Sequence, residues 1–210
     1  MRFDEDYYTQ TYTDYFKQNP SYKIQFYLNL IRAYAPLKTS LLDVGCGLGV
    51  FLKEASSFYE VQGIEMDAYA VGECRKVLGD TKVTQSALEK FPSTKTFGVV
   101  TAFDVLEHIE DLSQALTQIK NLLVPKGLIC VVVPVYDGPL GVIITRLDKD
   151  PTHLHKLSRE TWLTLLKKEF ELVDYIGILR YLLPGGWYLH IPTKLFRNIT
   201  PAIMMVARKR

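Results

Sequence analysis

The sequence has few cysteines and no long uncharged run. Its three cysteines, Cys46, Cys74 and Cys130, are widely spaced and include no Cys-x-x-Cys pair. This spacing argues against a disulfide scaffold and a zinc knuckle and indicates a reduced compartment, so we expect a cytoplasmic protein. The longest stretch without Asp, Glu, Lys or Arg is Tyr181 to Thr193, which contains two prolines and two glycines. We therefore expect no transmembrane helix, and the acidic start of the chain argues against a signal peptide.

Acidic residues are missing from the end of the chain. Tyr175 to Arg210 contains no Asp or Glu but six Lys or Arg residues, so it carries +6 while the whole chain carries +2. This basic segment has two interpretations. It can be a solvated tail, which suits Arg208 to Arg210, or a basic, aromatic surface that binds an anionic substrate or a membrane face. Composition does not decide between them, and peripheral membrane contact through residues 180–200 stays open.

The first two thirds of the chain alternate short apolar runs with amphipathic helices. The length of 210 residues suits one domain. The alternation predicts an α/β fold, a doubly wound, mostly parallel sheet with helices on both faces. The expected strands are 41–44, 61–65, 81–85, 97–103 and 128–133, and the expected helices are 51–59, 68–78 and 111–123.

The last third is less regular. Ser158 is a good N-cap for a helix to about Phe170, and strands are expected at 171–179 and 202–207. We expect residues 136–156 to form an irregular insertion with a short helix at 142–147. Residues 180–201 are expected to form a long connection rich in proline, glycine and aromatic residues. The first forty residues indicate one or two helices outside the sheet.

A glycine-rich turn joins the first strand to the first helix. It reads Asp43-Val-Gly45-Cys46-Gly47-Leu-Gly49. A dinucleotide loop would have Gly or Ala where this chain has Val50, and Asp43 would repel a pyrophosphate. These features disfavour a nicotinamide dehydrogenase and favour a cofactor that carries an amine and a sulfonium.

Polar residues follow the next three strands as well. Glu65 can accept both hydroxyls of a ribose, Gln85-Ser86-Ala87 ends the third strand, and 103–108 leaves the fourth. Because parallel strands of this fold end at one edge, we expect these residues to surround one ligand.

Together these motifs resemble the class I S-adenosylmethionine-dependent methyltransferases, most closely the group with the quinone-biosynthesis O-methyltransferases. The matching segments are LLDVGCGLG at 41–49, VQGIEMD at 61–67, FGVVTAFDVLEHI at 97–109, LLVPKGLICVVVP at 122–134 and the helix region 153–173. The resemblance covers roughly 38–175 and the final strand. It implies a Rossmann-like fold with a seven-stranded sheet, the last strand antiparallel, and S-adenosyl-L-methionine as cofactor.

The resemblance also assigns roles in cofactor binding. Asp43, Gly45, Gly47 and Gly49 would hold the methionine end, with Cys46 inside the loop and not a nucleophile. Glu65 would bind the ribose, Met66 would pack on the adenine, and Phe103 would lie beside the sulfonium. Ser86, next to Ala87, stands where the family usually has an Asp for the adenine amino group. Residues 1–37, with Tyr7, Tyr8, Tyr12 and Tyr15, would form a helical lid.

Three histidines are candidate general bases: His108, His153 and His155. Glu107 and His108 can instead be structural, Glu107 anchoring its loop and His108 pairing with it. A third alternative is a metal site, because the segment resembles the Glu-x-x-Glu-His motif of some quinone O-methyltransferases. Its ligands here would be Asp104, Glu107 and His108. We expect no metal, because Asp is a shorter ligand than the usual Glu.

The sequence thus predicts methyl transfer to a hydroxyl oxygen of a small or lipid-like acceptor. Nucleic acid is disfavoured, because the loop after the fourth strand lacks an Asn/Asp-Pro-Pro-aromatic motif. The alternative is a catalytically weak binding module, suggested by Ser86 and by Gly98, which replaces another usual Asp. Residues 136–156 and 180–201 should set specificity, with Arg180, Trp187, Tyr188 and His190 bordering the acceptor pocket or an apolar surface leading to it. The oligomeric state stays open.

Overall fold

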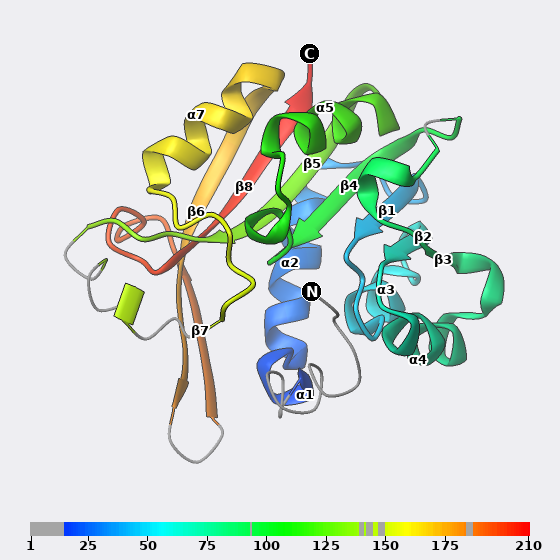
Figure 1. Ribbon diagram of the computed structural model, residues 1–210, viewed down its shortest axis with the longest axis horizontal. Helices are drawn as coiled ribbons and strands as arrows, with labels where there is room; N and C mark the ends of the chain where they lie inside the picture. Colours follow the sequence, from blue (N-terminus) through cyan, green and yellow to red (C-terminus); the bar gives the residue numbers. More distant parts are fainter. Residues whose placement is uncertain (1–14, 93, 139–140, 142–144, 147–149, 184–186) are drawn as a thin grey trace.

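The computed structural model describes residues 15–92, 94–138, 141, 145–146, 150–183 and 187–210. These residues build one eight-stranded sheet covered by helices on both faces (Figure 1). Within the described part of the chain, no helix is both long and apolar enough to span a membrane.

The strands are β1 (Ser40–Val44), β2 (Glu60–Glu65), β3 (Val83–Gln85), β4 (Phe97–Phe103), β5 (Leu123–Pro134), β6 (Phe170–Leu183), β7 (Trp187–Thr193) and β8 (Ala202–Lys209). The helices are α1 (Tyr15–Gln18), α2 (Ser21–Tyr34), α3 (Val50–Ala55), α4 (Ala68–Leu78), α5 (Leu112–Leu122) and α7 (Arg159–Glu169), with single 3₁₀ turns η2 (Asp80–Lys82), η3 (Leu88–Lys90) and η4 (Leu106–His108).

The strand order is β3-β2-β1-β4-β5-β8-β6-β7. Neighbours from β3 to β5 are parallel, and β8 lies antiparallel between β5 and β6. This confirms the predicted α/β fold with an antiparallel last strand. The strand count of seven was one too low, because β7 adds an eighth strand at the edge.

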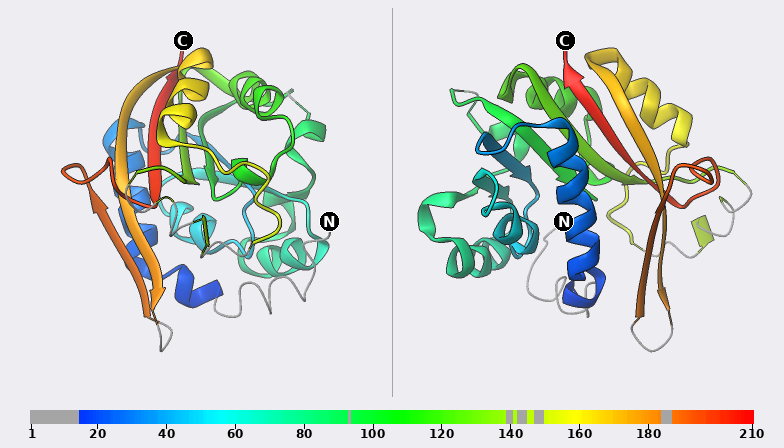
Figure 2. Two further views of the ribbon diagram at one scale, coloured as in Figure 1. Left: turned by 60° about the vertical axis from the view of Figure 1, so that its left-hand side comes forward. Right: turned by 180° about the vertical axis from the view of Figure 1, so that it is seen from behind.

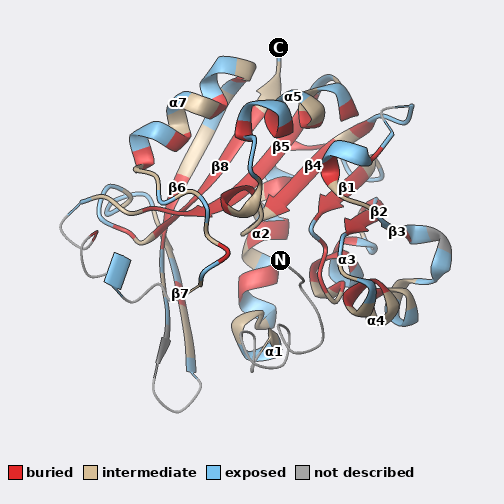
Figure 3. Ribbon diagram, in the orientation of Figure 1, coloured by how far each residue is buried: buried red, intermediate tan, exposed pale blue. Residues whose placement is uncertain are grey.

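The extra strand lies where the sequence predicts a long connection. That prediction for 180–201 was wrong in its first part, since β6 continues to Leu183 and pairs with β7 as an antiparallel hairpin. Pro192 suggested a loop, but β7 is an edge strand, and there a residue without an N–H group is tolerated. The hairpin projects past the helices (Figures 1 and 2), and Figure 3 shows it far less buried than the central strands.

Each face of the sheet has its own hydrophobic core. One core packs α5 and α7 on the sheet, with Leu116, Ile119 and Trp162 among its buried residues. The other packs α2, α3 and α4 on the opposite face, with Leu28 and Leu52 among its buried residues (Figure 2). Both layers leave the carboxyl ends of β1, β2 and β4 facing the same edge.

Two predicted elements fall wholly or largely outside the described residues. The helix expected at 142–147 includes four residues that are not described, and Tyr7, Tyr8 and Tyr12 of the expected lid lie before residue 15. From 152 to 155 the insertion packs on the loop after β4, where the amides of Leu154 and His155 donate to the carbonyl of Glu107.

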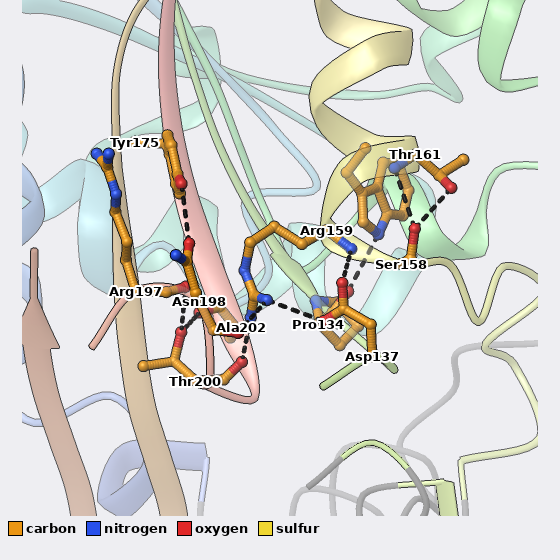
Figure 4. A network of polar contacts seen from close by, with 11 residues as sticks. Pro134, Asp137, Ser158, Arg159, Thr161, Tyr175, Arg197, Asn198, Thr200 and Ala202 are labelled. Atoms are coloured by element: carbon orange, nitrogen blue, oxygen red, sulfur yellow. Dashed lines mark hydrogen bonds and ion pairs between the residues drawn. The ribbon is translucent and has the colours of Figure 1, made fainter. Parts of the chain in front are cut away.

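A buried arginine fixes the start of α7. Ser158 caps the helix as predicted, accepting from the amide of Thr161 at 3.1 Å. The Arg159 side chain donates to the Asp137 carboxylate at 3.0 Å and to the carbonyls of Asn198 and Thr200 at 2.6 and 2.7 Å (Figure 4). This network ties α7 to the segments that follow β5 and precede β8.

We predict that Arg159→Met lowers the free energy of unfolding by about 3 kcal/mol, because it leaves a partly buried carboxylate and two carbonyls without their donor. Urea unfolding followed by circular dichroism measures this change. Lys168→Met, on the exposed side of the same helix, should stay within about 0.5 kcal/mol of the parent protein. Equal effects of the two variants would contradict the role of the network.

Candidate functional site

The glycine loop turns sharply after β1. Gly45, Gly47 and Gly49 all have positive φ, at 68°, 52° and 79°. The amides of Gly45 and Cys46 donate to the carbonyl of Ile64, at the end of β2. A Cβ atom on Gly47 would lie 2.7 Å from the hydroxyl of Tyr15. Glycine is therefore required at 47 both by the backbone conformation and by the close approach of α1.

Glu65 lies at the carboxyl end of β2 and faces this loop. Its carboxylate accepts from the amides of Gly47, Met66 and Asp67 at 3.0, 2.7 and 3.0 Å. Burial raises the pKa of Glu65, and these amides oppose that shift. Three bonds leave part of the accepting capacity of the two oxygens free, as the predicted ribose contact requires.

Asp43 is buried beneath the loop. Its Oδ1 accepts a hydrogen bond of 2.6 Å from the hydroxyl of Thr101 on β4. Burial raises the pKa of Asp43 to about 7, with the hydroxyl opposing and Glu65 adding to the shift. A positively charged ligand group beside it would remove this penalty.

A cavity lies between the glycine loop and the amino-terminal helices. Its lining residues come from α1, α2, the loop after β1, α3 and the end of β4: Tyr15, Asn19, Lys23, Ile24, Tyr27, Asp43, Gly45, Cys46, Val50, Phe51, Phe103 and Asp104. Phe103 contacts the rings of Tyr27 and Phe51, with centroids 4.7 and 5.0 Å away. The helices before β1 therefore contribute one wall of the cavity.

The predicted adenine contacts lie further along the same edge. Met66 is 56% exposed. Ser86 donates its amide to the carbonyl of Glu65 and its hydroxyl to the carbonyl of Ala87. Their roles toward adenine stay predictions.

The departure from the family pattern at Gly98 has a structural explanation, and the position of Cys46 agrees with its expected lack of reactivity. A Cβ on Gly98 would lie 2.0 Å from Thr39 Oγ1, and Gly98 is at the beginning of β4, away from the site. A side chain at position 98 would collide with Thr39, so packing explains why glycine replaces the usual Asp there. Gly98 therefore gives no support to the hypothesis of a catalytically weak binding module. Cys46 is buried with its sulfur 3.9 Å from that of Cys74, and this contact and burial raise its pKa, which suits a wall residue.

Two of the three predicted histidines come together. The rings of His108 and His153 are 4.8 Å apart. Nδ1 of His108 lies 3.0 Å from the carbonyl oxygen of Thr152, so in the neutral ring that nitrogen carries the proton and Nε2 is basic. Burial and His153 lower the pKa of His108. His155 instead donates Nε2 to the carbonyl of Ile109 at 2.8 Å, a structural contact.

The metal triad suggested by the sequence is not assembled as such. Asp104 is paired with Arg180 at 2.6 Å instead. His153 takes its place, and Glu107, His108 and His153 each offer one ligand atom within 4.8 Å of the others. Both carboxylate oxygens of Glu107 are buried without a hydrogen-bond partner, and burial raises its pKa well above the usual value. Glu107 and His108 do not pair with each other, and this group could hold a metal ion; the expectation of no metal stays a prediction.

Of the residues predicted to border the acceptor pocket, some contact residues that line the cavity and one is exposed on the hairpin. Arg180 reaches Asp104, and the buried His190 lies 3.3 Å from the hydroxyl of Tyr27. Trp187 is 78% exposed on the hairpin and borders no described cavity. Its predicted alternative role, on a surface leading to the site, stays a prediction.

Sequence reasoning missed the cavity residues of α2. Lys23 lines the cavity and is only 5% exposed. The signal was present, because Lys23 is four and eight residues before the buried Tyr27 and Ile31 and so lies on the apolar face of the helix. A lysine at such a position marks a buried charge.

The chain is similar in sequence to several known methyltransferases. The chain is 31% identical over 107 residues to a dTDP-3-amino-3,6-dideoxy-alpha-D-glucopyranose N,N-dimethyltransferase of Streptomyces fradiae, covering 49% of the chain and 42% of that protein. It is 31% identical over 100 residues to a ubiquinone biosynthesis O-methyltransferase of Actinobacillus pleuropneumoniae, covering 42% and 43%. A tRNA U34 carboxymethyltransferase of Vibrio cholerae is 28% identical over 129 residues, covering 57% and 40%. The matches thus span less than half of these relatives.

A solved structure covers nearly the whole chain. It is a methyltransferase from Thermotoga maritima, described as S-adenosylmethionine-dependent and a possible histamine N-methyltransferase, with a TM-score of 0.73, 15% identity and 98% of each chain covered. The methyltransferase domain model matches residues 15–174. The chain therefore belongs to the methyltransferase-domain family, whose cofactor is S-adenosylmethionine.

We predict that S-adenosylmethionine binding releases a fraction of a proton at pH 7. Asp43 is about half protonated there, and the cationic cofactor lowers its pKa. Calorimetry in buffers of different ionisation enthalpy measures the release, which should vanish at pH 9, where Asp43 is already ionised. Asp43→Asn should abolish it, whereas Glu60→Gln, at the exposed opposite end of β2, should not. Release that persists in Asp43→Asn would contradict the assignment.

Proposed function

We propose that this protein transfers the methyl group of S-adenosylmethionine to a hydroxyl oxygen of a small or lipid-like acceptor. The observation that carries the proposal is the His108–His153 pair beside the end of β4. Both rings are within electrostatic reach of Asp104, which lines the cavity. A base at this position is needed for a hydroxyl acceptor and is dispensable for a free amine.

The chemistry demands little more than alignment and proton removal. The methyl group of a sulfonium is already electrophilic, so the protein has to place the acceptor oxygen in line with it and exclude water. Phe103, with Tyr27 and Phe51 around it, supplies an apolar wall for that step. His108 is neutral at pH 7 because its pKa is lowered, so its basic nitrogen can take the hydroxyl proton directly or through His153.

Two other possibilities are less well supported. A quinone O-methyltransferase, a sugar N-methyltransferase and a tRNA carboxymethyltransferase are all among the relatives, so similarity alone does not choose the acceptor. The histidine pair favours oxygen, and the loop Phe103-Asp-Val-Leu after β4 lacks the motif of amino methylation on nucleic acids. A binding module without turnover loses one of its two arguments, because Gly98 is explained by packing.

We predict that the enzyme methylates phenols or sugar hydroxyls and that His108→Gln lowers kcat on the order of a hundredfold. Transfer of a radiolabelled methyl group to panels of phenols, amino sugars and tRNA measures this, with products identified by mass spectrometry. In the parent protein, kcat should fall as the pH drops below the lowered pKa of His108, since protonation removes the base.

The matched control is His155→Gln, whose ring contacts backbone and should leave kcat within a few fold. Exclusive methylation of amines, with no effect of His108→Gln, would refute the proposal. Binding of S-adenosylmethionine without transfer to any member of the three panels would favour the binding module.

A further inference from the structure

A lysine in the cavity wall is buried, and no described residue forms an ion pair with it. Lys23 lies on α2, and its ammonium donates to the carbonyl of Gln18 and to Oδ1 of Asn19, both at 3.1 Å. It also lies 5.2 Å from the ring centroid of Tyr188 and 5.8 Å from that of Tyr27. Among the described residues, none places a carboxylate within ion-pair distance of it. In the described part of the chain, the direct contacts of its ammonium group are thus with neutral oxygens and ring faces.

The nearest opposite charge is already engaged. Asp104 follows β4 with a φ of 57° and accepts from Arg180 of β6 at 2.6 Å. Burial would raise the pKa of Asp104, but Arg180 and Lys23 together hold it below its usual value. One carboxylate therefore faces two cations, and the group carries an excess positive charge at neutral pH.

Burial of an excess charge is costly unless a ligand of opposite sign completes the group. The cost is visible at Lys23, where burial lowers the pKa to about 8 even though Asp104 opposes the shift. The lysine remains mainly protonated at pH 7. An anion placed between Lys23 and Arg180 would be attracted by both.

The position of this group indicates which ligand would supply the anion. The predicted site for the methionine end of the cofactor is the loop from Asp43 to Gly49, whereas Lys23 interacts with Asp104, Arg180 and Tyr188. Asp104 directly follows Phe103 at the end of β4, whereas Arg180 and Tyr188 come from the β6–β7 hairpin, which the cofactor motifs do not include. The excess charge thus lies between the cavity wall and the hairpin, and none of these residues is among those that the family resemblance assigns to the cofactor.

We propose that Lys23 and Arg180 form a subsite for a carboxylate or phosphate of the methyl acceptor, so that the substrate is an anionic small molecule. This rests on the proposed function for the identity of the ligand as an acceptor. Asp104 orients Arg180 within the subsite, and Tyr188 covers Lys23. The hydroxyl to be methylated would lie on the same molecule, beyond the anionic group.

The test uses pairs of aromatic probes in which one member is anionic and the other is neutral. Calorimetry on the protein saturated with S-adenosylhomocysteine compares 4-hydroxybenzoate with 4-hydroxybenzamide, and phenyl phosphate with benzyl alcohol. The anionic member of at least one pair should bind on the order of tenfold more tightly. Lys23→Met should remove this preference and Lys23→Arg should retain it. The control is Lys53→Met, at an exposed position of α3, which should leave the preference unchanged. No preference for an anion in either pair would overturn the proposal.

A second arm distinguishes the acceptor from the cofactor as the source of the anion. S-adenosylhomocysteine carries a carboxylate, and 5′-methylthioadenosine does not. If Lys23→Met weakens the first about tenfold and leaves the second unchanged, the lysine serves the cofactor and the acceptor subsite is refuted. Unchanged affinity for both, together with a lost preference for anionic acceptors, supports the subsite and also shows that the variant is folded.

The two proposals can fail separately. Preference for anionic probes that depends on Lys23, without methylation of any hydroxyl compound, would refute the proposed function and retain an anion subsite. Methylation of neutral hydroxyl compounds as efficient as that of their anionic partners, and unaffected by Lys23→Met, would retain the function and refute the subsite.

Discussion

The site depends on the contact between the glycine loop and the end of β2. The carboxylate of Glu65 accepts the amide of Gly47, and the carbonyl of Ile64 accepts those of Gly45 and Cys46. These bonds hold the loop in its positive-φ conformation and set the distance between two adjacent parallel strands at their carboxyl ends. The cavity wall, the buried Asp43 and the approach of α1 to Gly47 all follow from that geometry.

The arrangement of the glycine loop and Glu65 at one edge of the sheet could be predicted from the sequence because its signals are local. The turn at 43–49 and Glu65 each stand directly after a recognisable apolar strand, and parallel strands bring such residues to one edge without further information. Ser158 as an N-cap and β8 as a strand were predictable for the same reason, whereas the antiparallel direction of β8 was implied by the family resemblance. Gly98 was misinterpreted, because its neighbour Thr39 is distant in the sequence and close only in the fold.

The residues of the proposed acceptor subsite could be predicted only in part, because they come from distant segments. Lys23, Asp104 and Arg180 come from α2, the end of β4 and β6, and no short motif links them. Proline and glycine concealed the β6–β7 hairpin, since an edge strand tolerates residues that a central strand excludes. His153 was a candidate, but its meeting with His108 depends on how 152–155 packs on the loop after β4.

The two ends of the cavity place opposite electrostatic demands on their ligands. Asp43 has a raised pKa, which a cation would relieve, and Lys23 has a lowered pKa, which an anion would relieve. A ligand of the wrong sign at either end would add to a burial penalty that is already present. Burial thus disfavours the charged form of both residues, and a cationic cofactor together with the proposed anionic acceptor would offset both effects. This arrangement would orient each molecule before any contact is made with the methyl group itself, because charge alone distinguishes the two ends.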